Sequence, residues 1–252
     1  MGIKIVISMS LGGRYLGDVE KEAIDYAIEK GCIVVAAAGN KGTEQMDYPG
    51  AYSPVISVAS GGWTLENIGT GESTHSPPYR WWLSNVPENF YTLDENGNKF
   101  QLFVNDFSGR PNPELGQKWC DLDVCSLGSW VVGPYSPYGC LVGGGGYFGY
   151  YYVGGTSQAT PHVSGITALV LQKYPNLVQW EMQLILKTAA LDNRMTKGFK
   201  NGEALVYAYI GGGMYDYETY TWTPWDYGTG FLQADSAMFT AFLFTRLRHC
   251  FW

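Results

Sequence analysis

Histidines, paired cysteines and long apolar runs are all scarce in this sequence of 252 residues. It has 3 histidines and no Cys-x-x-Cys pair, so a zinc site has little support. No apolar run reaches the length of about 18 residues that a membrane-spanning helix needs. Lysines and arginines are scattered, which argues against a nucleic-acid-binding surface. The net charge of −7 therefore describes solubility more than a partner.

The cysteines also lack the spacing of a disulfide framework, because they are odd in number and unevenly placed. They are Cys32, Cys120, Cys125, Cys140 and Cys250. Cys120, Cys125 and Cys140 fall in one loop-rich region, where a single bridge is the expectation and zinc the competing interpretation. Cys32 begins an apolar strand and is expected to be a buried thiol.

What the chain does contain is a globular composition, 46% hydrophobic and 15% charged, and an initial strand–helix–strand pattern. Residues 3–9 and 32–38 are nearly continuous apolar runs, typical of strands buried on both faces of a parallel sheet. Between them we expect a helix capped by Asp18 and ended by Gly31. Its apolar face is expected to hold Val19, Ala23, Ala27 and Ile28. Such a βαβ unit makes the strands parallel, with candidate sites at their carboxyl ends.

The most informative stretch is Gly-Gly-Thr-Ser-Gln-Ala-Thr-Pro-His-Val-Ser-Gly, residues 154–165. Ser157 stands at the predicted start of a helix, where free backbone N–H groups and the positive end of the helix dipole face outward. Gly155 allows another backbone to approach closely. Pro161 is expected in about the first turn, where its missing N–H costs little. The stretch is therefore interpreted as the mount of a nucleophilic serine, with a plain loop-to-helix turn as the alternative.

This stretch resembles the serine motif of the subtilisin-like serine proteases, the subtilases. Residues 7–13 resemble the family's substrate-binding strand, and residues 34–40 resemble the strand that ends in its oxyanion asparagine. Residues 48–59 and 225–237 resemble two further segments in the family's order. The resemblance implies an α/β three-layer sandwich with a mainly parallel, subtilisin-like sheet, whose N-terminal part is missing, together with a β-rich insertion.

The resemblance also implies a set of site residues. Ser157 would be the nucleophile, and Asn40 with the backbone N–H of Ser157 would form the oxyanion hole. The implied substrate-binding residues are Ser10, Leu11, Gly12, Gly13, Ala38, Gly39 and Gly155. They would bind a polypeptide and form an S1 pocket open to large apolar side chains. No metal ligand is assigned; structural calcium and secretion are habits of the family for which this sequence offers no residues.

The family's aspartate motif, Asp-Ser/Thr-Gly, and its histidine motif, His-Gly-Thr-His, are absent from the sequence. The histidines present are His75, His162 and His249. His162 follows Ser157 by about 500° of helical rotation and should point away from it. With no signal peptide before the first strand, we expect residues 1–252 to be the C-terminal portion of a subtilase catalytic domain. We expect it to be inactive alone, with the missing N-terminal part as a partner.

Other interpretations stay open or are rejected on particular residues. A triad rearranged around His75 and a non-catalytic pseudoprotease or binding domain are the open alternatives. Sedolisin relatives would need an aspartate at the oxyanion position held by Asn40. An α/β-hydrolase would need glycine in place of Ala159. A Gly-x-Gly-x-x-Gly match at residues 144–149 is rejected as a dinucleotide site because a strand, not a helix, follows it.

Domain organisation is less regular in the middle and at the end of the chain. Residues 61–118 lose periodicity, and we expect a peripheral insertion with a β-hairpin at 91–104 around an Asn-Gly turn. A cleft wall, a partner surface and a decorated loop are its open interpretations. A capping box of Asn176 with Gln179 predicts the start of a later helix. Residues 239–252 are unassigned, either an amphipathic helix or a tail.

Overall fold

The computed structural model describes residues 3–63, 102–129, 131–135, 149–191, 202–211 and 214–248. The strands of its central sheet are β1 (Val6–Met9), β2 (Ile33–Ala37), β3 (Ile56–Trp63), β4 (Leu102–Val104) and β5 (Val124–Leu127). β1 pairs with β2, β2 with β3, and β3 with β5, all in parallel. The short β4 pairs with β3 in antiparallel orientation. The sheet is therefore mainly parallel, as the sequence predicts.

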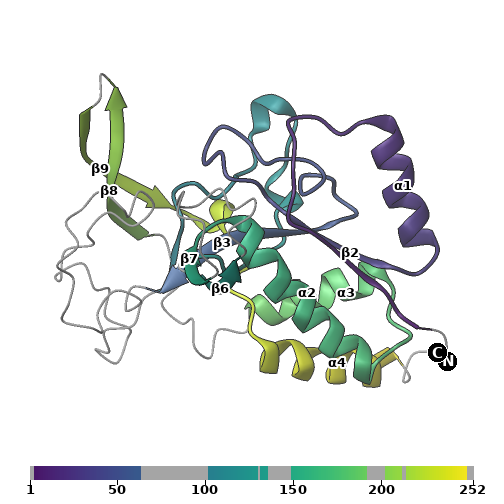
Figure 1. The fold of residues 1–252 in the computed structure, drawn as a ribbon. Helices are drawn as coiled ribbons and strands as arrows, with labels where there is room; N and C mark the ends of the chain where they lie inside the picture. Colours follow the sequence, from purple (N-terminus) through teal and green to yellow (C-terminus); the bar gives the residue numbers. More distant parts are fainter. Residues whose placement is uncertain are drawn as a thin grey trace.

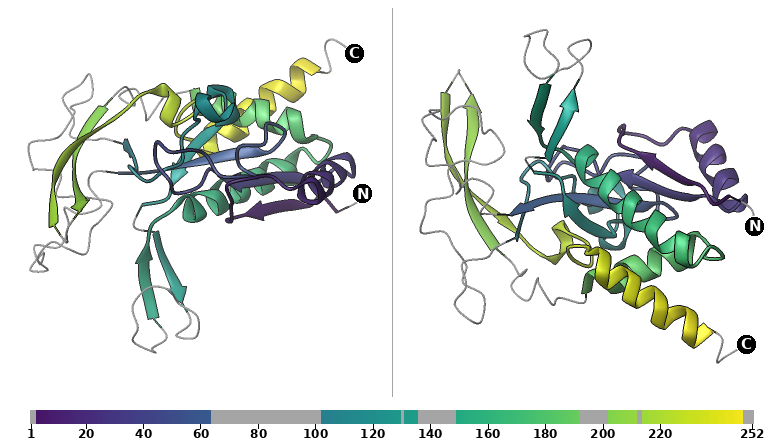
Figure 2. Two further views of the ribbon diagram at one scale, coloured as in Figure 1. Left: turned by 90° about the horizontal axis from the view of Figure 1, so that it is seen from above. Right: turned by 60° about the horizontal axis from the view of Figure 1, so that its bottom comes forward.

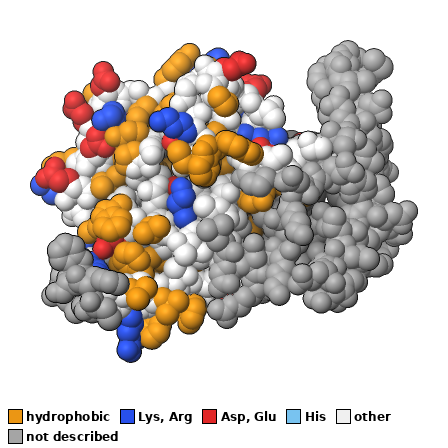
Figure 3. Space-filling view, turned by 180° about the vertical axis from the view of Figure 1, so that it is seen from behind, with side chains coloured by type: hydrophobic (Ala, Val, Ile, Leu, Met, Phe, Trp, Pro, Cys, Tyr) orange, Lys and Arg blue, Asp and Glu red, His pale blue; other side chains and the backbone are white. Residues whose placement is uncertain are grey.

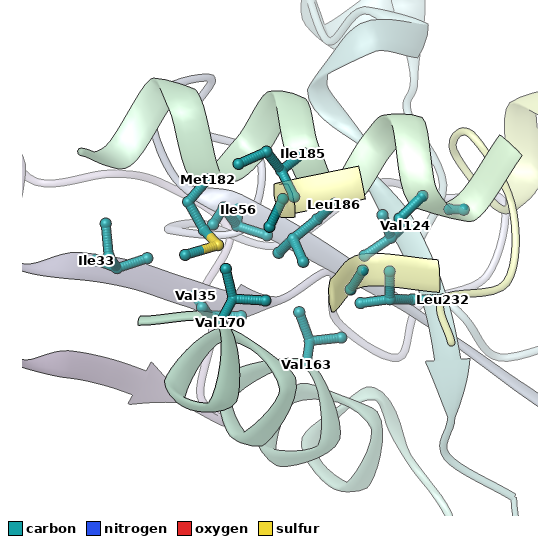
Figure 4. Packing of buried hydrophobic residues seen from close by; sticks show 14 of the residues in the cluster. Ile33, Val35, Ile56, Val124, Val163, Val170, Met182, Ile185, Leu186 and Leu232 are labelled. Carbon is teal, nitrogen blue, oxygen red and sulfur yellow. The ribbon is translucent and has the colours of Figure 1, made fainter. Parts of the chain in front are cut away.

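Four described helices cover the two faces of this sheet (Figure 1). They are α1 (Asp18–Glu29), α2 (Thr156–Lys173), α3 (Gln179–Leu191) and α4 (Ala234–Arg248). Alternation along β2 explains the layers: Val34 and Ala36 pack with Ile24 of α1. Ile33 and Val35 instead pack against residues of α2 and α3 (Figure 4). The three-layer α/β architecture is confirmed.

The prediction for α1 is right in extent and partly wrong in detail. Gly31 ends the helix with a left-handed φ of 85°. The N-cap is Gly17, without a side-chain cap, so Asp18 is the first helical residue rather than the cap. Val19 is exposed on the opposite side, and so is Ala23. The packed face consists of Ile24, Ala27 and Ile28, the i, i+3, i+4 set that meets the sheet.

Two antiparallel hairpins project from the layered body (Figure 2). They consist of β6 (Val131–Tyr135) with β7 (Gly149–Val153), and β8 (Gly202–Gly211) with β9 (Met214–Trp222). The strand expected just before the serine segment is β7. Short 3-10 helices occur at Pro113–Leu115, Trp119–Asp121 and Pro224–Asp226.

The expected insertion at 61–118 overlaps two strands of the central sheet, β3 and β4. Its first residues continue β3, and residues 102–104 of the expected 91–104 hairpin pair with β3 as β4. Val104 is buried in the same cluster as residues of the central sheet. Residues 102–110 therefore belong to the described fold, because β4 pairs with β3 and most of the residues after it are buried, whereas residues 113–116 are exposed. Residues 64–101, including the rest of the expected hairpin, lie outside the described part of the chain.

Near the C-terminus, the α3 capping prediction fails while the closing segment is confirmed. The backbone N–H of Val178 donates to Glu181 Oε2 at 3.0 Å, so the capping residue is Val178 rather than Asn176. Gln179 is drawn into the core instead. The Gly-x-Gly turn after Pro224–Asp226 leads into α4 as expected, and α4 extends the helical part of residues 239–252 as far as Arg248.

The disulfide expectation is wrong for the cysteines that are described. Cys32, Cys120 and Cys125 are free thiols, and Cys32 is half-buried rather than fully buried. Cys125 lies on β5 inside an apolar cluster, whereas Cys120 lies in the short helix outside it. Burial raises the pKa of the Cys125 thiol. Cys140 and Cys250 lie outside the described residues.

β1 is the edge of the sheet among the described strands, with β2 as its one hydrogen-bonded neighbour. Next to it, Ile3 and Ile5 are 93% and 53% exposed. On the face seen from behind, hydrophobic side chains lie in separate groups with charged side chains among them (Figure 3). Within the described ranges, no helix has the length and apolar character of a membrane span.

Candidate active site

Ser157 is the second residue of α2, directly after the turn that the sequence predicts as its mount. The N-cap is Gly155, and its φ of 156° and close neighbours explain the glycine. A Cβ at Gly155 would lie 2.8 Å from Gln158 Oε1 and 3.4 Å from Asn40 Nδ2. The N–H of Ser157 is among those that have no acceptor within the helix. The half-buried Ser157 thus has its amide at the start of the helix, where it can serve as a donor.

Asn40 reaches the same turn from the carboxyl end of β2. Its Oδ1 accepts hydrogen bonds from Thr156 N at 3.0 Å and from Thr156 Oγ1 at 2.9 Å. A backbone N–H can only donate, so the atom that faces it must be the amide oxygen. This leaves Nδ2, the donor end of the amide, toward Gly155 and the start of α2. The arrangement suits the stabilisation of a developing oxyanion by two N–H donors.

The hydroxyl of Ser157 is engaged with the end of β1. Ser157 Oγ donates to the carbonyl of Ser10 at 3.2 Å, and Ser10 Oγ donates to the carbonyl of Ser157 at 2.7 Å. His162, the one histidine in the described residues, is exposed, and its Nδ1–H donates to Gln158 O at 2.8 Å. His75 and His249 lie outside the described ranges. The hydroxyl therefore has a carbonyl partner and, within the described residues, no basic one.

The predicted substrate strand is accessible over most of its length. Ser10, Leu11, Gly12 and Gly13 are exposed, Leu11 by 57%. Gly13 exchanges two backbone hydrogen bonds of 2.8 Å with Tyr48, which holds the strand end in an extended form. A Cβ at Gly12 would lie 2.7 Å from that of Asp47, so this position accommodates only glycine.

Ala38, whose backbone the resemblance places along the S1 pocket, follows directly after β2. Its side chain is fully buried. Its N–H donates to Val58 O at 3.0 Å, and its carbonyl accepts from Asp47 N at 2.8 Å. The N–H and the carbonyl of Ala38 are therefore both hydrogen-bonded within the fold. Gly39, also buried, has a φ of 94°, and its carbonyl accepts from Gly109 N at 2.7 Å.

A supporting loop that the sequence did not reveal clamps the asparagine turn from behind. The N–H of Gly42 donates to Phe107 O at 2.8 Å, and the N–H of Arg110 donates to Gly42 O at 3.0 Å. A Cβ at Gly109 would clash with the carbonyl of Ala38. These residues lie in the segment interpreted as an insertion, where no periodicity distinguishes a buried loop from an exposed one.

Charged side chains lie near the strand end and in the supporting loop. Lys41 Nζ is 3.1 Å from Asp47 Oδ1, and the side chain of Asp47 lies next to Gly12 and Gly39. Asp106 lies in the supporting loop, and burial raises the pKa of its carboxyl from 3.8 to about 6. The described residues hold no cluster of three or more acidic, histidine or cysteine side chains that would suit a metal ion.

Comparison with known proteins gives a consistent result. The model of the subtilase family matches residues 3–99 and 142–209, well over half of the chain. Subtilisin from Bacillus sp. (strain TA39) is 28% identical over 204 residues, which are 80% of this chain and 40% of that protein. Thermitase from Thermoactinomyces vulgaris is 32% identical over 165 residues, which are 66% of this chain and 39% of that protein. The chain thus spans less than half the length of these two relatives.

Solved structures agree on the fold. Sphericase superposes with a TM-score of 0.54 at 27% identity, covering 91% of this chain and 57% of that one. Fervidolysin from Fervidobacterium pennivorans, described as a keratinolytic enzyme related to subtilisin, gives a TM-score of 0.52 at 24% identity, covering 90% of this chain and 25% of that one.

Proposed function

Because this chain belongs to the subtilase family of serine proteases, we propose that it is the C-terminal portion of a serine endopeptidase catalytic domain, across residues 1–252. In the proposed reaction, Ser157 Oγ attacks a peptide carbonyl carbon, and the hydroxyl proton passes to a base. The oxyanion that forms is held by Asn40 Nδ2 and the N–H of Ser157. The C–N bond then breaks as the proton moves to the departing amine, and water hydrolyses the resulting ester.

The orientation of the Asn40 amide is the observation that carries this proposal. Thr156 donates two hydrogen bonds to Asn40 Oδ1. The donor end of the amide, Nδ2, must then face the start of α2, where Ser157 lies. Donors fixed before the reaction need no reorganisation when charge develops, and one such donor typically contributes about 10²–10³ in rate. A turn that served only to join a strand to a helix would have no need of this arrangement.

The proposed polypeptide substrate would lie along residues 10–13. Their exposed backbone is already extended against Tyr48, as an incoming strand would require. Leu11 and Gly155 would border an S1 pocket for large apolar side chains. Because Ala38 is buried, it would lie beneath the surface of this pocket rather than at it.

The acid and the base are proposed to come from polypeptide outside these 252 residues. The family's two motifs are absent from the sequence, and the hydroxyl of Ser157 rests on a carbonyl, which cannot take its proton. The chain alone should therefore retain at most the residual catalysis of an oxyanion hole, about 10³–10⁴ over water.

The open edge of β1 is the proposed place for this missing part. An apolar parallel strand is normally paired on both sides, and an unpaired apolar edge invites another strand. A segment that paired in parallel with β1 would end at the same edge of the sheet as Ser10, which contacts Ser157. Residues following that segment would then be delivered to the nucleophile.

The alternative is a non-catalytic pseudoprotease or binding domain that keeps the fold. The absence of the two motifs favours it, as does an exposed aromatic pair, Trp119 and Trp225, whose ring centroids lie 5.9 Å apart. Both side chains are more than half exposed, which would suit a docking role.

Cleavage of a fluorogenic peptide distinguishes the two functions. The chain is assayed alone and after joining to the aspartate- and histidine-bearing part of a relative. We expect cleavage only in the joined protein, and its loss in Ser157→Ala. A correctly folded joined protein without activity would support the non-catalytic alternative, and activity that survives Ser157→Ala would overturn the assignment of the nucleophile.

A further inference from the structure

Pro161 leaves the carbonyl of Ser157 without its helical partner. In an α-helix the carbonyl of residue i accepts from the N–H of residue i+4, and for Ser157 that residue is Pro161. The proline is the sixth residue of α2, in the second turn rather than the first as the sequence suggested. Its missing N–H is therefore not one of those that a helix start leaves free, and its ring also crowds the carbonyl of residue i−4.

Ser10 supplies the donor that this carbonyl lacks. Its Oγ donates to Ser157 O at 2.7 Å, across 147 residues of sequence. In return, the carbonyl of Ser10 accepts from Ser157 Oγ at 3.2 Å. One residue at the end of β1 thus contacts both the backbone and the side chain of the nucleophile.

We propose that Ser10 is a positioning residue for Ser157, and that Pro161 creates the need for it. The proline frees the carbonyl of Ser157 from the helix, and the hydroxyl of Ser10 fixes that carbonyl to β1. The first turn of α2 is thereby held where Asn40 meets it. Ser10 acts through Ser157 and need not touch the substrate with its side chain. The role in catalysis rests on the proposed function, whereas the coupling between Ser10 and Pro161 does not.

A double-mutant cycle with Ser10→Ala and Pro161→Ala tests the coupling through urea unfolding of the chain as it stands. With Pro161 present, Ser10→Ala should lower the folding equilibrium constant roughly two- to tenfold, the effect of one net hydrogen bond. In the Pro161→Ala background, the new N–H of residue 161 can bond to Ser157 O, so Ser10→Ala should change the constant less than about twofold. An equal loss in both backgrounds would overturn the proposal.

Ser8 provides a matched control on the same two elements. Its Oγ accepts from Ser164 Oγ at 2.8 Å, another link between β1 and α2 that does not involve residue 157 or 161. Ser8→Ala should have the same effect with Pro161 present as in the Pro161→Ala background. If Ser8→Ala depended on residue 161 as strongly as Ser10→Ala, the cycle would be reporting a shift of the whole helix, and the specific coupling would be refuted.

Rescue and kinetics separate positioning from packing. Ser10→Thr keeps the hydroxyl and should remain within about twofold of the unchanged chain in stability, whereas an effect as large as that of Ser10→Ala would contradict the proposal. In the joined protein, Ser10→Ala should lower kcat roughly tenfold with KM little changed, and Asn176→Ala, at an exposed position outside the site, should leave both unchanged. A Ser10→Ala effect confined to KM would overturn the positioning role. If the joined protein has no activity, the proposed function fails, and the cycle still decides the coupling.

Discussion

At the scale of single residues, the orientation of one amide determines what the site can do. Asn40 would be ambiguous from the sequence, since asparagine after a strand commonly serves a turn. The backbone N–H of Thr156 removes the ambiguity because it requires an oxygen opposite it. The amide nitrogen is then the group that remains for a ligand.

We expect Asn40→Ala in the joined protein to lower kcat by about 10²–10³ with a smaller effect on KM, because the donor acts on charge that develops after binding. Steady-state kinetics with a fluorogenic peptide measure this. Asn176→Ala, at an exposed position outside the site, is the control and should be neutral. An Asn40→Ala enzyme with unchanged kcat would remove Asn40 from the oxyanion hole.

Asp106 predicts a pH dependence of stability. Burial raises the pKa of its carboxyl to about 6, above the unfolded value. Its contribution to stability is therefore fully present below pH about 4 and is lost as the pH rises through about 6. Asp106→Asn should raise the free energy of unfolding by roughly 1–3 kcal/mol at pH 7.5 and have little effect near pH 4.

Urea unfolding at the two pH values measures this effect. Glu22→Gln, an exposed position on α1, is the charge-removal control. A stability difference between Asp106→Asn and the unchanged chain that was the same at both pH values would contradict the expectation.

At the scale of elements, a helix side chain completes the edge of a strand. Gln179 of α3 is buried. Its Oε1 accepts from Val34 N at 2.8 Å, and its Nε2 donates to Val34 O at 3.1 Å and to Pro54 O at 2.7 Å. Pairing of β2 with β3 begins only at Val35, so the amide replaces the strand partner that Val34 would otherwise lack.

Gln179→Leu should therefore destabilise the chain by about 2–4 kcal/mol, because both backbone groups of Val34 lose their partner inside the fold. Chemical denaturation measures the change. Gln172→Leu, at an exposed position on α2, should stay within about 0.5 kcal/mol. A neutral Gln179→Leu would show that water or a backbone shift satisfies β2 equally well.

Gln179 also shows which parts of the elements the sequence could predict. The strands β1 and β2 and the helices α1 and α2 follow from apolar runs and glycine boundaries, and those predictions hold apart from the cap and the apolar face of α1. The role of Gln179 did not follow, because a polar residue near a helix start is taken for a cap unless its tertiary partner is known. The buried loop at 105–110 was missed for the same reason: its order comes from contacts with residues 39–42, not from any local pattern.

The candidate site also has a part that could be predicted from the sequence and a part that could not. Ser157, Asn40 and the strand end at Ser10 could be placed from their motifs and their order along the chain. The burial of Ala38 and the partnership of Ser10 with Pro161 could not, because both depend on how β1, β2 and α2 meet. Pro161 removes a helical hydrogen bond only because it lies in the second turn of α2. The start of a helix can be predicted from sequence only to within a residue or two, so the sequence could not establish this position.

At the scale of the whole molecule, the described fold is well packed where α2, α3 and α4 meet the sheet, but the sheet edge at β1 has no partner strand within the described residues. α2, α3 and α4 share a continuous apolar cluster with the sheet. At β1, by contrast, the sheet has an unpaired edge within the described residues, beside the hydroxyl of Ser157. The chain spans 40% and 39% of two relatives. These observations support a nucleophile and an oxyanion hole that act together with polypeptide from outside the sequence.

Labelling by a fluorophosphonate probe, with the modified residue located by mass spectrometry, tests this account most directly. The probe forms a bond to phosphorus only at a serine whose proton a base can accept. We expect no appreciable labelling of the chain alone, and labelling at Ser157 once the chain is joined to the part that bears the acid and the base. Rapid labelling of Ser157 in the chain alone, or labelling of a different serine in the joined protein, would contradict the account.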